Sequence, residues 1–166
     1  MDIWTYYKAI TRRLLVWSVI SVAASATLLL LSLGCTFPVT LSMLNPLFQM
    51  GIGLQSLAWG MIDAGIALVG GWVTRRRRAG LADPSAPEVL AREARNLRRI
   101  LLVNTGLDVL YVAGGVALAL IVGLDNLFWR GNGWGIVVQG GFLFCFDLLH
   151  ALGVPELGVP GPESAP

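Results

Sequence analysis

Four long apolar stretches alternate with shorter polar segments along the chain. They cover residues 14–33, 51–73, 100–122 and 134–152, and each provides about the 20 residues that a helix needs to cross the hydrocarbon core of a bilayer. All eight prolines lie outside these stretches, as expected for uninterrupted helices. The pattern predicts an all-α fold, namely an integral membrane four-helix bundle formed by residues 14–152.

The segments that flank the four spans have distinct patterns. Residues 1–13 predict an interfacial amphipathic helix that leads into the first span. Its apolar positions recur at helical spacing: Ile3, Trp4, Tyr7, Ile10 and Leu14. The connection 36–49 is uncharged and contains two prolines, so we expect it to lie on or dip into the membrane interface. The tail 153–166 is rich in proline and glycine and has no periodicity, which predicts disorder unless a partner orders it.

Charge distribution predicts the orientation of the bundle. Eleven of the twelve Lys and Arg residues either precede the first span or lie between the second and third spans, and Arg130 alone lies on the other side. The positive-inside rule therefore places both termini and the loop 74–99 in the cytoplasm, with the chain in a bacterial cytoplasmic membrane. The run of Arg75, Arg76, Arg77 and Arg78 is typical of a topology signal, and its alternative role is to face and bind anionic lipid headgroups.

The third helix is expected to start well before the membrane. Ser85 and Glu88 form a capping box, which predicts a helix that begins there and continues into the third span. Over about 36 residues at 1.5 Å each it reaches roughly 50 Å, more than a bilayer core requires. Its first turns therefore project into the cytoplasm, where an apolar stripe that includes Ala94 and Leu97 packs on the bundle or docks a partner.

Three aspartates occur inside the predicted second, third and fourth spans: Asp63, Asp108 and Asp147. An ionised side chain in hydrocarbon is costly even on lenient insertion scales, so an acid in this place is a functional-site hypothesis. Counted at 1.5 Å per residue, the acids lie roughly 15, 13 and 8 Å from the cytoplasmic ends of their spans, which places all three in the inner half of the bilayer.

The acids share helix faces with other polar residues, and these stripes predict a polar seam inside the bundle. The seam comprises Gln55, Asp63, Asn104, Asp108, Tyr111, Gln139, Asp147 and His150, and the first span adds Ser18, Ser21 and Ser25. His150 is expected to be a partner of Asp147 near the cytoplasmic end. The seam can hold the helices together through hydrogen bonds, conduct protons or cations, or line a binding cavity.

The two halves of the bundle resemble each other. Gln55 precedes Asp63 by eight positions, and Gln139 precedes Asp147 by the same eight. A pair of arginines followed by aliphatic residues also opens the first and third spans. Because both hairpins begin inside the cell, these similarities predict a parallel duplication about an axis along the membrane normal.

The sequence contains few residues that could bind a cofactor or carry out catalysis. Cys35 lies at the outer end of the first span and Cys145 near the middle of the fourth, so their depths are mismatched for a disulfide. His150 is the single histidine, which excludes a bis-histidine haem or a histidine metal cluster within one chain. Membrane-protease, nucleotide-binding and thiol-oxidoreductase motifs are absent as well, so we expect no metal and no enzymatic activity. The net charge of +2 gives no reason to expect nucleic acid as a partner.

Three segments carry a resemblance to a known family. Residues 101–115 (LLVNTGLDVLYVAGG), 130–147 (RGNGWGIVVQGGFLFCFD) and 59–67 (WGMIDAGIA) resemble a family of small bacterial four-span membrane proteins of unknown function. The resemblance covers the second to fourth spans and implies no activity. It implies a shared polar pattern made of Asn104, Asp108, Tyr111, Gln139 and Asp147. At position 63 the family pattern leads us to expect Asn, so Asp63 is a departure.

Three functions follow as hypotheses. The first is a non-enzymatic accessory or scaffolding subunit of a membrane complex, which holds other subunits or further copies of itself through small helix faces. Such faces include Gly131 with Gly135, and Ala113 with Ala117. The second is a small proton- or cation-coupled transporter or channel that uses the three acids. The third is a bundle that binds a lipid, quinone or pigment, so the cofactor stays unknown while membrane lipids are expected partners.

Overall fold

The computed structural model describes residues 2–33 and 45–155, and within them the chain forms four long helices and no strand. They are α1 (Ile3–Ser32), α2 (Pro46–Ala79), α3 (Pro87–Ala117), which continues into the π-helical turn η2 (Leu118–Val122), and α4 (Leu127–Leu152). By length and composition, each of the four is able to cross a membrane. The predicted all-α fold of four apolar helices is confirmed, and it is consistent with a multi-pass membrane protein.

Some predictions fall outside the described residues. They concern Cys35, most of the connection 36–49, and the tail beyond residue 155. The segment 1–13, expected as an interfacial helix leading into the first span, is described from Asp2 onward and is continuous with α1.

Side-chain caps determine where three of the helices begin. The Asp2 carboxylate accepts hydrogen bonds from the backbone N–H groups of Trp4 and Thr5, and Asn45 accepts one from Leu47 at 2.9 Å. Asn126 likewise accepts from the first turn of α4. These caps satisfy N–H groups that have no partner within a helix.

The predicted capping box at the start of α3 is wrong. The helix begins at Pro87 with Ala86 as its N-cap and no side-chain cap, while Ser85 donates its backbone N–H to Asp83 Oδ1 at 2.8 Å. The reason is Pro87. Its ring is suited to the first helical position and disfavours helical geometry in the residue before it, so the helix starts two residues after Ser85.

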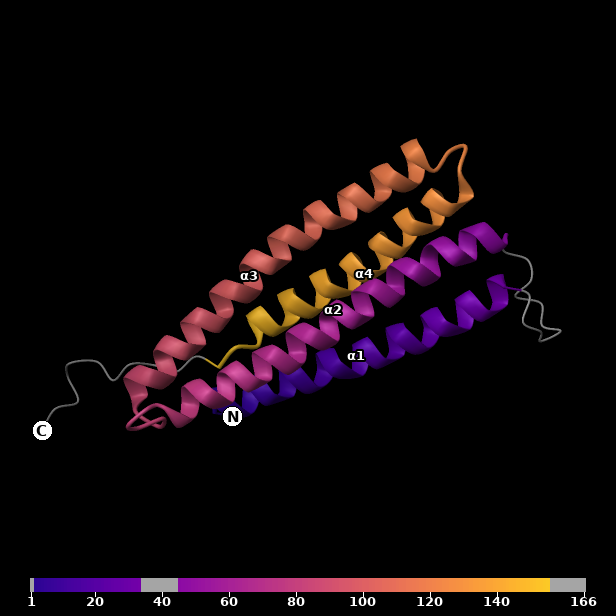
Figure 1. Cartoon of the computed structure of the whole chain (residues 1–166). Helices are drawn as coiled ribbons and strands as arrows, with labels where there is room; N and C mark the ends of the chain where they lie inside the picture. Colours follow the sequence, from indigo (N-terminus) through magenta and orange to yellow (C-terminus); the bar gives the residue numbers. More distant parts are fainter. Residues whose placement is uncertain (1, 34–44, 156–166) are drawn as a thin grey trace, which may run out of the picture.

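The helices run side by side as two hairpins, α1 with α2 and α3 with α4, and the hairpins meet through α2 and α4 (Figure 1). The start of α1, the turn between α2 and α3, and the end of α4 lie at the same end of the bundle (Figure 1). We call this the basic end, because it includes Arg12, Arg13 and the run 75–78. The two hairpins are compatible with the predicted duplication, which stays a prediction.

Small residues let the helices approach closely. A Cβ on Gly131 would overlap the carbonyl oxygen of Phe48, and a Cβ on Gly135 would lie 3.0 Å from the Gln55 side chain. Between α1 and α2, a Cβ on Gly60 would lie 3.2 Å from Cβ of Ser21. Gly131 and Gly135, expected to provide a face for close helix contacts, are therefore used within the bundle, against α2.

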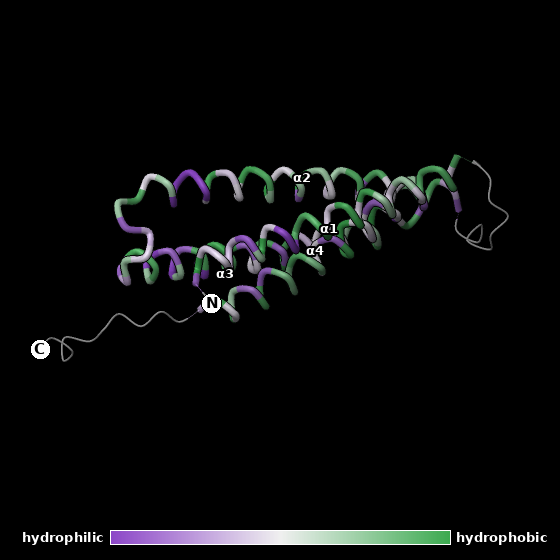
Figure 2. Tube along the Cα trace, turned by 90° about the horizontal axis from the view of Figure 1, so that it is seen from below, coloured by the Kyte–Doolittle hydropathy of each residue, from purple (hydrophilic) through white to green (hydrophobic). Residues whose placement is uncertain are grey.

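Apolar packing is concentrated at the basic end, and polar groups occupy much of the remaining interior. Ile3 and Trp4 of α1, Ala94 and Leu97 of α3, and Ala151 of α4 belong to one buried cluster. The apolar stripe predicted at the start of α3 thus packs on its own bundle. The outside carries large apolar side chains, and Figure 2 shows the hydrophilic segments of α2 and α3 gathered toward the basic end.

Candidate functional site

The three aspartates lie in the interior of the bundle, each on a different helix. Asp63 on α2 is 1% exposed, Asp108 on α3 is 9% exposed and Asp147 on α4 is 8% exposed. Asp63 and Asp108 are near enough for their charges to interact, and Asp147 interacts with both. The three acids, which the sequence predicts to lie on inward helix stripes, therefore come together in the structure. We call this group the aspartate cluster.

The aspartate cluster has few partners. Asp63 Oδ2 and Asp108 Oδ2 are buried and accept no hydrogen bond. Across residues 2–33 and 45–155, the ion pair between Arg77 and Glu93 is the only one, so no cationic side chain pairs with any of the three acids. A buried polar atom without a partner costs about 1–3 kcal/mol, and such an atom in a folded protein calls for an explanation.

Asn104 connects the cluster to the outside of α3. It is exposed, yet its side chain is within hydrogen-bonding reach of Asp147. Asn104 lies one helical turn from Asp108, so both residues of α3 face the same region, as the sequence predicts. The cluster therefore has a polar neighbour with access to the molecular surface.

Aromatic and amide groups follow on the side away from the basic end. The rings of Trp59 on α2 and Tyr111 on α3 meet edge to face, with centroids 4.8 Å apart. Gln55 Nε2 lies 3.5 Å from the Tyr111 hydroxyl, a long hydrogen bond. Gln55 and Tyr111, together with Asp63 and Asp108, thus form a row of polar groups between α2 and α3.

The predicted seam groups Gln139 with the acids, but in the structure Gln139 contacts α1 instead. Its side chain is 2% exposed and faces α1, where Oε1 accepts from the Trp17 indole N–H at 2.9 Å and Nε2 donates to Ser21 Oγ at 3.1 Å. The Trp17 ring also stacks on Phe142, with centroids 3.6 Å apart. Gln139 therefore joins α4 to α1, while the acids join α4, α2 and α3.

The expected pairing of His150 with Asp147 is wrong. His150 Nε2 lies 3.0 Å from Arg13 Nη1, and Nδ1 lies 2.6 Å from the backbone oxygen of Phe146. Because the carbonyl can only accept, Nδ1 carries the proton and Nε2 accepts from Arg13. Three residues of helix turn His150 by about 60° from Asp147, which is enough to direct it toward α1 instead of α3.

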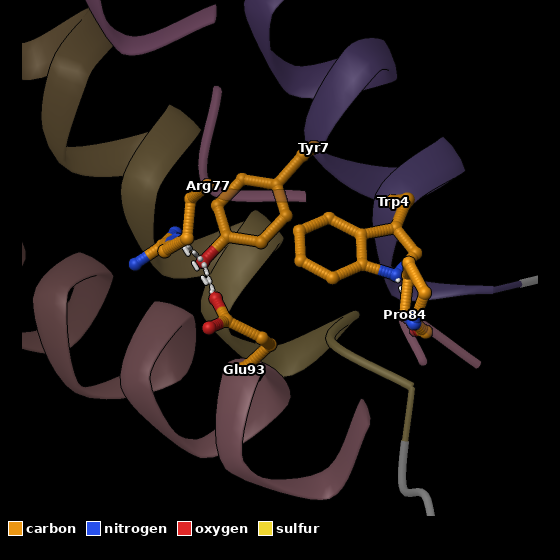
Figure 3. Close-up of polar contacts among 5 residues, drawn as sticks. All are labelled: Trp4, Tyr7, Arg77, Pro84 and Glu93. Atoms are coloured by element: carbon orange, nitrogen blue, oxygen red, sulfur yellow. Dashed lines mark hydrogen bonds and ion pairs between the residues drawn. The ribbon is translucent and has the colours of Figure 1, made fainter. Parts of the chain in front are cut away.

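A buried acid that sequence analysis missed lies at the basic end. Glu93 is 2% exposed, and its Oε2 lies 3.0 Å from Arg77 Nη2 and 3.5 Å from the Tyr7 hydroxyl (Figure 3). Next to it, Trp4 donates its indole N–H to the Pro84 carbonyl at 2.9 Å (Figure 3). The signal in the sequence is Glu93 itself, an acid on the apolar stripe of Leu90, Ala94 and Leu97.

The four arginines of the run 75–78 make different contacts. Arg77 pairs with Glu93, and Arg76 lies over the Trp72 ring at 4.3 Å from its centroid. Arg75 and Arg78 line a groove between α1 and α2. The four arginines, equivalent in the sequence analysis as headgroup-facing residues, are thus not equivalent in the structure.

The aspartate cluster does not have the arrangement of a site in which three or more side chains hold one metal ion together. Within the described part of the chain, no group of three or more His, Cys, Asp or Glu side chains could hold a metal ion. What the cluster offers is three carboxyl groups of low solvent access, an amide at one side and a phenol at the other. The carboxyl and phenol groups can bind and pass protons, and the oxygens of all these groups can each contribute to binding a weakly held cation.

Comparison with known proteins defines the family. The profile described as "Family of unknown function (DUF6992)" matches residues 13–148, most of the chain. The chain belongs to DUF6992. The resemblance noted in the sequence is thereby confirmed as membership in a family of unknown function, and the structure has the four helices it implied. The DUF6992 match includes all three aspartates and ends before His150. No curated protein and no solved structure matches the sequence.

Proposed function

We propose that this protein is a small, non-enzymatic, proton- or cation-coupled transporter or channel whose binding site is the aspartate cluster. It would lie in the cytoplasmic membrane of a bacterium with its basic end in the cytoplasm, as the distribution of Lys and Arg predicts. The observation that carries the proposal is the burial of two carboxylate oxygens, Asp63 Oδ2 and Asp108 Oδ2, without any hydrogen-bond donor.

A purely structural role explains these acids poorly. Residues that hold helices together should have partners, as Gln139 has in Trp17 and Ser21. Asp63 is as buried as Gln139 but leaves one oxygen without a donor, at a cost of about 1–3 kcal/mol. Like charges in one buried place also repel one another, and a bound proton or monovalent cation relieves that repulsion.

Polar groups continue from the cluster in both directions. Asn104 leads from Asp147 to the surface of α3, and Tyr111 and Gln55 continue toward the other end of the bundle. Carboxyl and phenol groups are suited to passing a proton, the amides beside them can only form hydrogen bonds, and none of these groups is an activated nucleophile. This supports transfer of a small cation rather than a reaction on a substrate.

The test combines binding and flux. The purified protein and its Asp63→Asn, Asp108→Asn and Asp147→Asn variants are reconstituted in vesicles, and proton, Na⁺ and K⁺ fluxes are followed under imposed gradients. Infrared spectra of the carboxylic acid C=O band over a pH series report proton binding directly. Asp125→Asn is the matched control, since Asp125 is an exposed acid outside the helices.

We expect flux with the unmodified protein and the Asp125→Asn variant, and loss of most of it with each cluster variant. A pH-dependent C=O band should disappear in part with each of those three substitutions. Flux equal to that of empty vesicles, or equal flux in all the variants, would overturn the proposal.

A second candidate function is favoured by the outer face of α3. A Cβ added to Gly106 would have no neighbour within 4 Å, and Ala113 and Ala117 on the same side are exposed. Small residues of this kind allow close contact with another membrane helix, as an accessory or scaffolding subunit requires. Purification in mild detergent followed by native mass measurement tests this function, because a lone monomer with no other chain would contradict it.

A further inference from the structure

A groove of about 670 Å³ lies at the basic end between α1, α2 and the turn that follows α2. Its walls include Trp4 and Tyr7 near the start of α1 and Arg78 near the end of α2. Leu15, Ala67 and Leu68 lie at the opposite end of the groove, toward the middle of the helices. None of the three clustered aspartates lines it, so the groove is separate from the proposed cation site.

All the charged side chains that line the groove are basic. Four basic side chains line it, Lys8 and Arg12 from α1 with Arg75 and Arg78 from α2, and no acidic residue is among the lining residues. Arg77 pairs with Glu93 and Arg76 lies over the Trp72 ring, so Arg75 and Arg78 are the two arginines of the run that line the groove. Asp2 interacts electrostatically with Arg78, but its carboxylate already accepts the N–H groups of Trp4 and Thr5.

The groove is basic at one end and apolar at the other, as a lipid molecule has a polar headgroup at one end and an acyl chain at the other. The basic residues and Trp4 occupy the part nearest the basic end, and the far part is apolar. Trp4 and Leu15 are eleven residues apart, roughly 16 Å along a helix, which is enough for a headgroup and the first part of an acyl chain. Thr11 and Thr74, which precede Arg12 and Arg75 in the sequence, also line the groove.

We propose that this groove binds one anionic phospholipid, with its phosphate among Lys8, Arg12, Arg75 and Arg78 and an acyl chain against Leu15, Ala67 and Leu68. Charge complementarity selects the occupant, because guanidinium and ammonium groups bind phosphate and no carboxylate in the groove competes for them. The apolar far end requires a ligand with a hydrocarbon chain, which a free phosphate lacks. An aromatic residue at the headgroup level, here Trp4, is typical of the membrane interface.

The experiment measures lipid binding to the detergent-purified protein by native mass spectrometry. The probes are dioleoyl phosphatidylglycerol, dioleoyl phosphatidylcholine and water-soluble glycerol 3-phosphate. The main variant is Arg75→Gln/Arg78→Gln, and Lys8→Gln/Arg12→Gln tests the other wall. Arg92→Gln/Arg95→Gln is the matched control, since these arginines are exposed at the same end and lie outside the groove.

The unmodified protein should bind phosphatidylglycerol at least tenfold more tightly than phosphatidylcholine, and glycerol 3-phosphate only weakly. Each groove variant should lose phosphatidylglycerol affinity by roughly 30-fold, as expected when two basic groups are removed from an anionic headgroup. The control should change less than threefold. A phosphatidylglycerol with a photoreactive acyl chain should cross-link to residues near Leu15 or Leu68.

Three results would overturn the proposal: equal affinity for the two phospholipids, equal losses in the groove and control variants, or glycerol 3-phosphate binding as tight as lipid binding. The second wall variant keeps the test valid if one double substitution unfolds the protein. Because all these substitutions leave the aspartate cluster intact, cation flux and lipid binding can fail independently.

Discussion

Trp17 on α1 donates its indole N–H to the side-chain oxygen of Gln139 on α4, across 2.9 Å. The same amide donates to Ser21, so one buried residue connects α4 with two turns of α1. Gln55, at the equivalent place before Asp63, instead reaches from α2 to Tyr111 on α3. Each of the two glutamines therefore connects its hairpin to the outer helix of the other hairpin.

The difference between these two contacts predicts unequal effects of substitution. Gln139→Ala removes two interhelical hydrogen bonds and leaves the half-buried Trp17 indole without its acceptor, so it should lower the free energy of unfolding by roughly 2 kcal/mol. Gln55→Ala removes one long hydrogen bond of a half-buried residue and should cost less than about 1 kcal/mol. Unfolding in a detergent–SDS titration measures both, and a larger loss for Gln55→Ala would contradict the assignment.

Hydropathy alone was sufficient to predict the four helices, because a long apolar run has few alternatives to a membrane-spanning helix. Helical periodicity also predicts that Asp63, Asp108 and Asp147 lie on inward stripes, and the structure brings them together. Periodicity places residues on a helix face but does not say which neighbour that face meets. Periodicity therefore predicts that His150 pairs with Asp147, whereas in the structure His150 lies against Arg13 of α1.

The basic end shows a second limit of sequence analysis. Arg75 to Arg78 look alike as a run of four, and only the position of α3 decides that Arg77 meets Glu93. The burial of Glu93 on α3 likewise depends on the start of α1, from which Tyr7 reaches its carboxylate, and α1 and α3 are far apart in the sequence. Contacts of this kind follow from tertiary packing, which local pattern does not contain.

The glycines of α2 and α4 give a steric prediction. A Cβ on Gly131 would overlap the backbone oxygen of Phe48, and backbone cannot move aside as a flexible side chain can. Gly131→Ala should therefore separate α2 from α4 and destabilise the protein by about 2 kcal/mol or more. Gly65→Ala is the control, because a Cβ there meets nothing within 4 Å. It should be neutral or stabilise the helix by up to about 1 kcal/mol. Equal effects in the SDS titration would show that the two helices do not cross at Gly131.

The ion pair at the basic end predicts an asymmetry between its partners. The Arg77 side chain is 42% exposed and the Glu93 side chain 3% exposed. Arg77→Gln leaves a buried carboxylate unpaired, which typically costs about 3–5 kcal/mol, whereas Glu93→Gln leaves a guanidinium that water can solvate. We expect Arg77→Gln to lower the unfolding free energy by at least twice as much as Glu93→Gln.

Arg76→Gln is the control for this pair. It removes only a contact with Trp72 and should change the unfolding free energy by less than about 1 kcal/mol. Equal losses for Arg77→Gln and Glu93→Gln would mean that the carboxylate is not held by Arg77.

The aspartate cluster gives the prediction that best separates function from architecture. If Asp63 serves cation binding, its carboxylate should lower the free energy of unfolding, because Oδ2 lacks a hydrogen-bond donor and Asp108 repels the carboxylate. Asp63→Asn keeps the shape of the side chain and removes its charge, so it should raise the unfolding free energy by about 1 kcal/mol at neutral pH while removing most of the cation flux. Asp125→Asn, on an exposed turn, should leave stability within about 0.5 kcal/mol and flux unchanged. Destabilisation by Asp63→Asn would instead identify the acid as part of the hydrogen-bonded framework, as Gln139 is.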